Sequence, residues 1–226
     1  MNSSFSSDDV VTAIGGIRNR TISVLRAAGE ERAAQIVPTC PAWTAKELSC
    51  HMYGVCDDLL NGRLEGVGSE AWTQAQVDRR SGMPLDDLLD EWAASGDTFD
   101  VMVAELPKPA NYQLVMDMAT HEHDIRLALG SPGAQDDPSL AIGSAYMLRN
   151  VAKIDADLAE QIQGCGLTDF ECLRSLTGRR SMAQLEASGL DAEALSRFLA
   201  MSPMTMVETD LVEVAASGSS TGPASK

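Results

Sequence analysis

The chain has 226 residues, of which 44% are hydrophobic, and this is enough for one domain with a sizeable core and short tails. Its 33 acidic and 17 basic residues give a formal net charge of −16, which disfavours a phosphate backbone, so no nucleic-acid partner is expected. No apolar run approaches the roughly 20 residues that span a bilayer, and the first residues lack the basic start and apolar middle of a signal peptide. We therefore expect no membrane partner and a cytoplasmic protein.

The sequence contains five cysteines, none of them in a C-x-x-C pair: Cys40, Cys50, Cys56, Cys165 and Cys172. Free cysteine usually behaves as a small buried apolar residue, so we expect reduced thiols. Cys50 stands next to His51 in a predicted helix. Adjacent helical residues diverge by about 100°, which makes Cys50 only a minor candidate as a metal ligand.

In the first third of the chain, apolar residues at helical spacing predict two helices. Ser7 is expected to cap the first helix, which continues to Gly29. Residues 37–43 include two prolines and predict an extended entry to the second helix, which begins at Thr44 with Glu47 completing a capping box. Residues 62–82 are polar and are interpreted as a mobile connection with one short helical turn.

Proline and glycine signals delimit the helices that follow. Pro84 opens a third helix that reaches Val103, and a proline-rich turn at 106–109 leads into a fourth that ends at Leu129. A fifth helix is expected over 138–164, and shorter ones over 169–176 and 191–201. Strand alternation is expected at most near 205–214.

Together these elements predict an all-α fold, a four-helix bundle with additional C-terminal helices. We expect a bundle domain over residues 8–201. A disordered N-terminus (1–7) should precede it, and a largely disordered C-terminal tail (202–226) should follow. The chain carries no Gly-rich phosphate loop, which argues against a nucleotide enzyme.

Two of the chain's three histidines lie in the predicted fourth helix. His121 belongs to its inward-facing apolar stripe, and Asp117 lies one turn earlier on the same face. His51 borders the apolar stripe of the second helix. We expect these three side chains to converge inside the bundle, with ligating atoms within about 4 to 5 Å of one another. His123 is rotated by about 200° from His121, so we expect it to face solvent or make a secondary contact.

A site of two imidazole nitrogens and one carboxylate oxygen is the ligand set of a divalent metal that keeps an open fourth position. Zinc is the first expectation, and nickel, iron and manganese stay open because ligand type alone ranks metals poorly. Asp124, three residues after His121, is a candidate to orient an imidazole through a hydrogen bond. The competing interpretation is that each histidine is a hydrogen-bonded core residue.

Three segments carry a family resemblance. Residues 37–44, followed by His51, match the pattern V-P-x-C-P-x-W-x…H. Residues 117–130 are similar to E-x-x-x-H-x-x-D-I-R-x-A-L-G, and residues 176–181 contain a Gly-Arg-Arg-Ser turn. In these segments the sequence resembles the mycothiol-dependent maleylpyruvate isomerase-like proteins, a family of DinB-type metal-binding four-helix bundles, over residues 8 to about 200. The resemblance implies metal ligands at His51, Asp117 and His121, with Asp117 standing where the family usually has the longer glutamate.

The resemblance also implies an enzyme that uses a divalent metal and a low-molecular-weight thiol, mycothiol, as cofactor or co-substrate. A metal-bound thiol loses its proton readily, and the thiolate can add to an electrophilic carbon in thiol transfer or cis-trans isomerisation. The expected partners are therefore the small-molecule thiol and an electrophilic substrate. Arg126 is expected to bind the cofactor, and Arg179 and Arg180 are further candidates to meet a carboxylate. The competing interpretation of each arginine is a solvated or structural role.

Two other functions are compatible with the same ligands. A metal-assisted hydrolase would activate water in place of a thiol. A non-catalytic metal-binding protein would use the metal structurally or as cargo. Turnover that needs no thiol would favour the first, and a metal position closed to solvent would favour the second.

Overall fold

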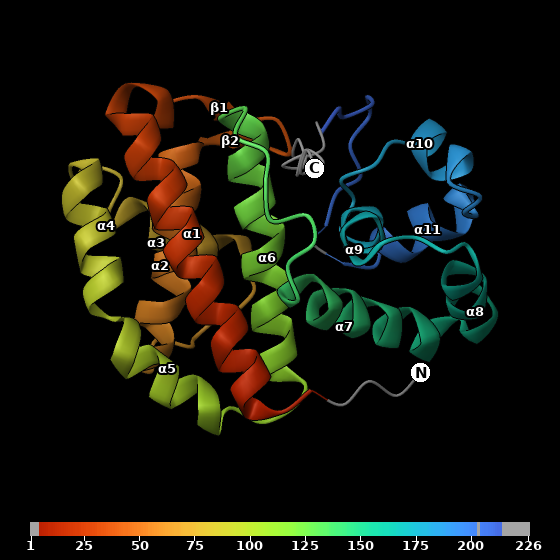
Figure 1. The fold of residues 1–226 in the computed structure, drawn as a ribbon, viewed down its shortest axis with the longest axis horizontal. Helices are drawn as coiled ribbons and strands as arrows, with labels where there is room; N and C mark the ends of the chain where they lie inside the picture. Colours follow the sequence, from red (N-terminus) through yellow and green to blue (C-terminus); the bar gives the residue numbers. More distant parts are fainter. Residues whose placement is uncertain (1–4, 203, 214–226) are drawn as a thin grey trace, which may run out of the picture.

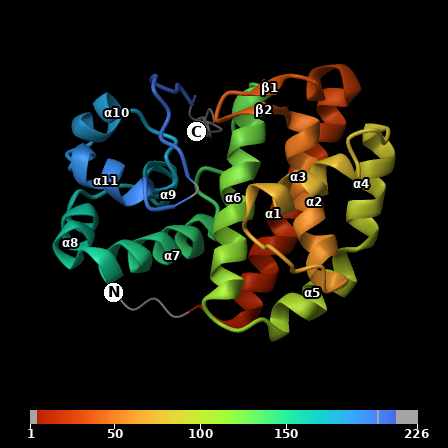
Figure 2. The ribbon, with the colours of Figure 1, turned by 180° about the vertical axis from the view of Figure 1, so that it is seen from behind.

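Helix α6 (Ala110–Ala128) runs through the middle of the molecule, with helices packed on both of its sides (Figure 1). The helices of residues 7–33, 45–60 and 85–105 lie on one side, and the helices of residues 139–199 form a second group on the other, as Figure 2 shows from behind. The computed structural model describes residues 5–202 and 204–213. Within these ranges the chain is helical apart from one short hairpin and the connecting loops, which confirms the predicted all-α, DinB-like bundle with additional C-terminal helices.

The helices that lead to α6 begin where capping side chains satisfy their free backbone N–H groups. Helix α1 (Ser7–Ala33) is capped by Ser6, one residue before the predicted cap, through a 3.1 Å hydrogen bond from the backbone N–H of Asp9. At Gly29, where the first helix is predicted to stop, the backbone leaves the helical conformation with a φ of 73°, and a further short helical segment continues past this kink to Ala33. Helix α2 (Ala45–Leu60) begins after Thr44, and its predicted capping box with Glu47 is confirmed.

The extended entry to α2 forms a small antiparallel hairpin, β1 (Ile36–Val37) paired with β2 (Cys40–Thr44). Its strands contact both α2 and α6. The hairpin therefore places the segment around Cys40 beside the two helices that carry the histidines.

Two predictions between α2 and α6 are wrong. The polar connection contains α3 (Glu70–Asp78), a helix of 9 residues capped by Ser69, where the sequence predicts a single turn. The predicted third helix is two helices, α4 (Leu85–Ala94) and α5 (Gly96–Glu105). At their junction the Arg18 guanidinium lies 2.9 Å from the position that a Cβ on Gly96 would take. A side chain at position 96 would therefore have to displace the Arg18 guanidinium, which packs against the glycine from α1.

The second group of helices departs from prediction in a similar way. The predicted fifth helix is divided into α7 (Ser139–Ile154) and α8 (Ala156–Gly164), because Asp155 leaves the helical conformation and caps α8 at the backbone N–H of Leu158. The predicted short helices correspond to α9 (Asp169–Leu176) and α11 (Ala192–Leu199). Between them, α10 (Met182–Ala187) is not predicted. Residues 204–213 contain no strand, and position 214 lies outside the described residues.

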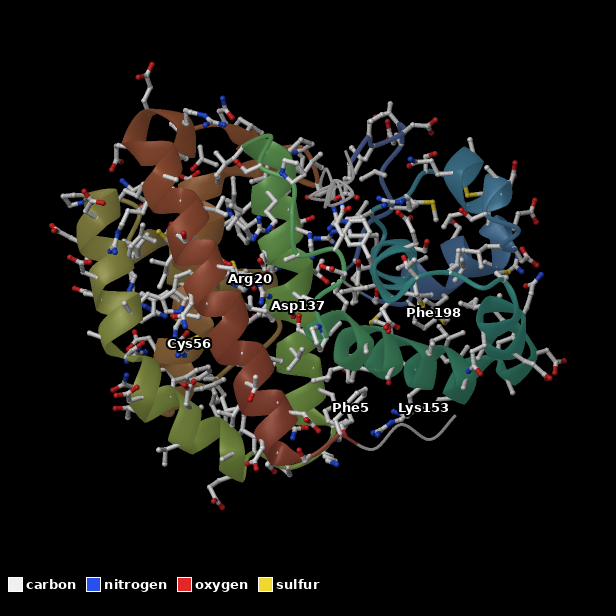
Figure 3. All side chains as sticks on the ribbon, in the orientation of Figure 1. Phe5, Arg20, Cys56, Asp137, Lys153 and Phe198 are labelled. Carbon is white, nitrogen blue, oxygen red and sulfur yellow. The ribbon has the colours of Figure 1, made fainter. Side chains whose placement is uncertain are left out.

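Charged side chains join α6 to its neighbours. Arg20 of α1 donates two hydrogen bonds to the Glu122 carboxylate of α6, at 2.9 and 2.8 Å, and a third to Asp137 at 2.6 Å. Figure 3 labels Arg20 and Asp137, which face each other where α1 meets the loop before α7.

Within the described ranges, no helix has both the length and the apolar character needed to cross a bilayer.

Both ends of the described chain make specific contacts. The backbone N–H of Phe5 donates to the Tyr112 hydroxyl at 2.9 Å, and Glu213 forms ion pairs with Arg174 and Arg180 at 2.8 and 2.5 Å. The predicted disordered segments fall partly on residues 1–4, 203 and 214–226, which lie outside the described residues. The division into tails and domain stays a prediction.

Candidate metal centre

The structure brings together one histidine from α2 with a carboxylate and a histidine from α6. Ligand atoms of His51, Asp117 and His121 all lie within 4.8 Å of one another. The Asp117 carboxylate stands between the two rings: Oδ2 is 3.8 Å from Nε2 of His51, and Oδ1 is 3.5 Å from Nε2 of His121. The two rings meet edge to face, with centroids 5.3 Å apart.

These separations suit a small divalent ion. Ligand bonds of about 2.0 to 2.1 Å in a tetrahedron place neighbouring donor atoms roughly 3.3 Å apart. The two oxygen-to-nitrogen distances, 3.5 and 3.8 Å, exceed that value by only a few tenths of an ångström. Two imidazole nitrogens and one carboxylate oxygen are also a donor set used by metals with an open position. The residues present therefore fit a divalent metal.

Hydrogen bonds at the far side of each ring leave the Nε2 atoms facing Asp117. Nδ1 of His121 lies 3.1 Å from Oδ2 of Asp124, so this nitrogen carries the proton that the carboxylate accepts. Nδ1 of His51 lies 2.7 Å from Oε1 of Gln76, a side chain of α3. When its ring is neutral, a histidine that donates from Nδ1 presents a lone pair at Nε2, and this is the form that a metal binds. The sequence prediction that Asp124 orients an imidazole agrees with this geometry.

The local charges act differently on the two imidazoles. Burial lowers the pKa of His51, and the neighbouring Asp117 only partly opposes this effect. Burial would also lower the pKa of His121, but Asp117 and Asp124 outweigh it and raise that pKa well above its ordinary value. Burial would raise the pKa of the Asp117 carboxyl, but His121 and His51 outweigh this effect and hold that pKa below the usual value.

A buried ionic network holds Asp124 in place. Arg174 and Arg179 donate to its two carboxylate oxygens, each at 2.7 Å, and the side chains of Asp124 and Arg174 are both 0% exposed. Burial would raise the pKa of Asp124, but the two guanidiniums outweigh it and hold the pKa well below the usual range. Arg179 and Arg174 therefore act on the site indirectly, by fixing the carboxylate that orients His121.

A second group of candidate ligands consists of Cys40, His121 and Asp124, whose ligand atoms also lie within 4.8 Å of one another. Cys50, the cysteine that the sequence singles out, belongs to neither group among the described residues. Both oxygens of Asp124 already accept hydrogen bonds from guanidiniums. Among the described residues, Asp117 forms ion pairs only with the two imidazoles, so the first group offers the freer set of donors.

One side of the first group is open. The Asp117 side chain is 32% exposed to solvent, whereas the side chains of His51 and His121 are 7% and 12% exposed. Trp43 covers His51 with a tilted ring contact at 5.6 Å, and both Trp43 and Cys40 are partly exposed. Of the three side chains, Asp117 therefore presents the most surface to solvent.

The remaining sequence candidates lie elsewhere. His123 is only 4% exposed and packs against the ring of Phe170 at 4.8 Å, so of the two alternatives the solvent-facing one is wrong and the secondary contact agrees with the structure. The reason is tertiary: the C-terminal helices cover the side of α6 opposite His121. Arg126 donates to Glu122 and to the Ser131 carbonyl, and it lines a separate cavity of about 290 Å³ together with His123.

Arg180, another arginine of the sequence analysis, is bound by acidic side chains of its own group of helices. Its guanidinium forms ion pairs with Glu171 at 2.9 Å and with Glu213 at 2.5 Å. Gln76 is the contact that sequence analysis misses, since it lies in the segment interpreted as a connection. The Ser69 cap before a run of residues free of glycine and proline is the local signal that could reveal α3.

The fold and the cluster define a class: an all-α bundle with two histidines and one carboxylate gathered between α2 and α6. Residues 15–129 match the family described as the mycothiol maleylpyruvate isomerase N-terminal domain, and the chain belongs to that family. The match includes all three residues of the cluster. Neither a curated protein nor a solved structure matches the chain.

Proposed function

We propose that this protein is a metal-dependent enzyme that uses a low-molecular-weight thiol, mycothiol, for thiol transfer to an electrophilic small molecule or for its cis-trans isomerisation. The observation that carries the proposal is the pair of Nε2 atoms facing a partly exposed Asp117, at 3.8 and 3.5 Å, in a chain of this family. A site closed to solvent could not admit two reactants. This one is open on the Asp117 side.

His51, Asp117 and His121 would hold the divalent metal, with zinc as the first choice. Such an ion lowers the pKa of a bound thiol, so that the nucleophile for addition to an electrophilic carbon is available near neutral pH. The protein's own side chains fix the donors: Asp124 orients His121, and Gln76 orients His51. Trp43 shields one face of His51 from water.

A cofactor contact by Arg126 stays a prediction. Its guanidinium is engaged by Glu122 and the Ser131 carbonyl, and it faces the separate cavity of about 290 Å³, which His51, Asp117 and His121 do not line. A role for Arg126 in binding would therefore require a ligand that reaches this cavity.

The test begins with metal analysis of the purified protein and continues with a panel of electrophiles, such as cis-configured unsaturated acids and epoxides. Each is assayed with and without metal and with and without mycothiol. We expect turnover only when both are supplied. We also expect His121→Ala to lose activity with its metal, whereas His123→Ala, which alters a residue on the other side of α6, should keep the metal.

Two outcomes would contradict the proposal. Equal rates with and without thiol would instead favour a metal-assisted hydrolase, in which the same three donors serve to activate water. No turnover across the panel by a protein that carries stoichiometric metal would favour a non-catalytic metal-binding protein.

A further inference from the structure

Helix α3 inserts a glutamine between two polar residues of α2. His51, Gly54 and Asp58 lie three and four residues apart, so they occupy one face of α2, and α3 packs on that face. The Gln76 side chain is 0% exposed and spans this face: Oε1 lies 2.7 Å from Nδ1 of His51, and Nε2 donates to Oδ2 of Asp58 at 2.9 Å.

The orientation of the Gln76 amide follows from its neighbours. Asp58 accepts hydrogen bonds from Arg63 and Arg79 at 2.6 and 2.5 Å and is 0% exposed. Burial would raise the pKa of Asp58, but the hydrogen bonds from Arg63, Gln76 and Arg79 outweigh it and keep the pKa low. An ionised carboxylate only accepts hydrogen bonds. The NH₂ group of Gln76 must therefore face Asp58, which turns its Oε1 toward His51.

The same argument determines which nitrogen of His51 carries the proton. An amide oxygen only accepts, so Nδ1 of His51 must donate to it. The proton of the neutral ring is then used at Nδ1, and Nε2 presents its lone pair toward Asp117, 3.8 Å away. A hydrogen-bonded chain of three residues, Asp58, Gln76 and His51, thus converts the charge on Asp58 into a fixed orientation of the His51 ring.

Gly54 makes this arrangement possible. A Cβ placed on Gly54 would lie 2.5 Å from Cβ and 2.8 Å from Cγ of Gln76, well inside any tolerated contact. The glycine therefore lets α3 approach α2 closely enough for Gln76 to reach both polar partners. Intrinsic helix propensity favours alanine over glycine by about 1 kcal/mol, so the glycine is explained by this contact.

We infer that Gln76, locked by Gly54 and polarised by Asp58, is a positioning residue that holds His51 with Nε2 free for a ligand. The inference deepens the proposed function and rests on it for the metal, but the state of His51 can be measured without one. Side chains that orient a metal-binding histidine typically change metal affinity by about 10 to 100-fold when removed.

The experiment measures two quantities in the full-length protein: the protonated nitrogen of His51 in the metal-free state, by ¹⁵N NMR of the imidazole, and zinc affinity, by chelator competition. In the wild-type protein we expect the proton on Nδ1. In Gln76→Leu, which keeps the packing volume and leaves Asp58 paired with its arginines, the Nδ1 signal should shift toward the other tautomer. Zinc affinity should fall by about 10 to 100-fold.

Gly54→Ala tests the same contact from α2 with every polar group retained, and it should reproduce both effects. Gly164→Ala in α8 is its matched control, because nothing lies within 4 Å of an added Cβ there. Gln113→Leu, at an exposed position of α6, is the control for the glutamine. Both controls should leave the tautomer and the affinity unchanged.

The two proposals fail separately in this design. An unchanged His51 tautomer and zinc affinity in Gln76→Leu would overturn the positioning role while leaving the metal-dependent function intact. A wild-type protein that binds no metal, yet shows the predicted tautomer change in Gln76→Leu, would overturn the proposed function and support the positioning role.

Discussion

Replacement of Asp117 tests whether the site is built for an aspartate, at the position where the sequence resemblance leads us to expect a glutamate. Structural zinc sites release about 10 to 16 kcal/mol on binding through four protein ligands, or roughly 3 kcal/mol for each. This corresponds to about a 100-fold change in affinity for one ligand. We therefore expect Asp117→Ala to weaken zinc binding by about 100-fold.

Asp117→Glu should not improve zinc binding. The Asp117 oxygens already lie 3.5 and 3.8 Å from the two Nε2 atoms, close to the spacing of donors around zinc. An added methylene lengthens the side chain by about 1.5 Å, and the side chain must bend to absorb it. We expect Asp117→Glu to bind zinc no more tightly than the wild-type protein.

The assay is competition with a chromogenic chelator at fixed pH, with circular dichroism to confirm that each variant is folded. Asp117 is partly exposed, so neither change should unfold the bundle. Tenfold tighter binding by Asp117→Glu would refute the argument, because it would mean that the aspartate is too short. Unchanged binding by Asp117→Ala would exclude Asp117 as a ligand.

Three further predictions concern other parts of the molecule. His121→Ala should abolish stoichiometric metal by elemental analysis, whereas His123→Ala should keep it; loss in the second variant alone would reassign the ligand. Arg174→Met removes one partner of a fully buried ion pair and should cost roughly 3 to 5 kcal/mol in urea denaturation. The exposed control Arg149→Met should stay within about 0.5 kcal/mol of wild type; equal stability of the two would contradict the argument. Burial raises the pKa of three thiols to about 12, so little thiolate forms at pH 8 and mass-mapped alkylation of the native protein should spare them: Cys50, Cys56 and Cys172.

The relative placement of Asp117 and His121 could be predicted from the sequence because both lie on one helix. A separation of four residues puts two side chains on one face whatever packs against it. The same local chemistry predicts the capping boxes: the Thr44 hydroxyl and the Glu47 carboxylate meet within a single turn. Such predictions depend only on contacts between residues three or four positions apart in the sequence.

Helix breaks were harder to predict. The predicted third helix is interrupted at Ser95, and Gly96 begins α5 with Arg18 packed beside it. Asp155 ends another helix by leaving the helical conformation to cap the next. In each case a long-range or capping contact, and not propensity, decides whether a glycine or aspartate interrupts the helix.

The sequence by itself determined the helical class, the main caps and the phase of the α6 residues, since these follow from the 3.6-residue period and from hydrogen bonds to near neighbours. Only the tertiary structure decided the distance from His51 to Asp117, the contact of Gln76 with His51, the arginines on Asp124 and the burial of His123. Each of these joins residues 25 or more positions apart. Their approach depends on how whole helices pack, including the fit of Gln76 over Gly54, and no local pattern encodes that packing.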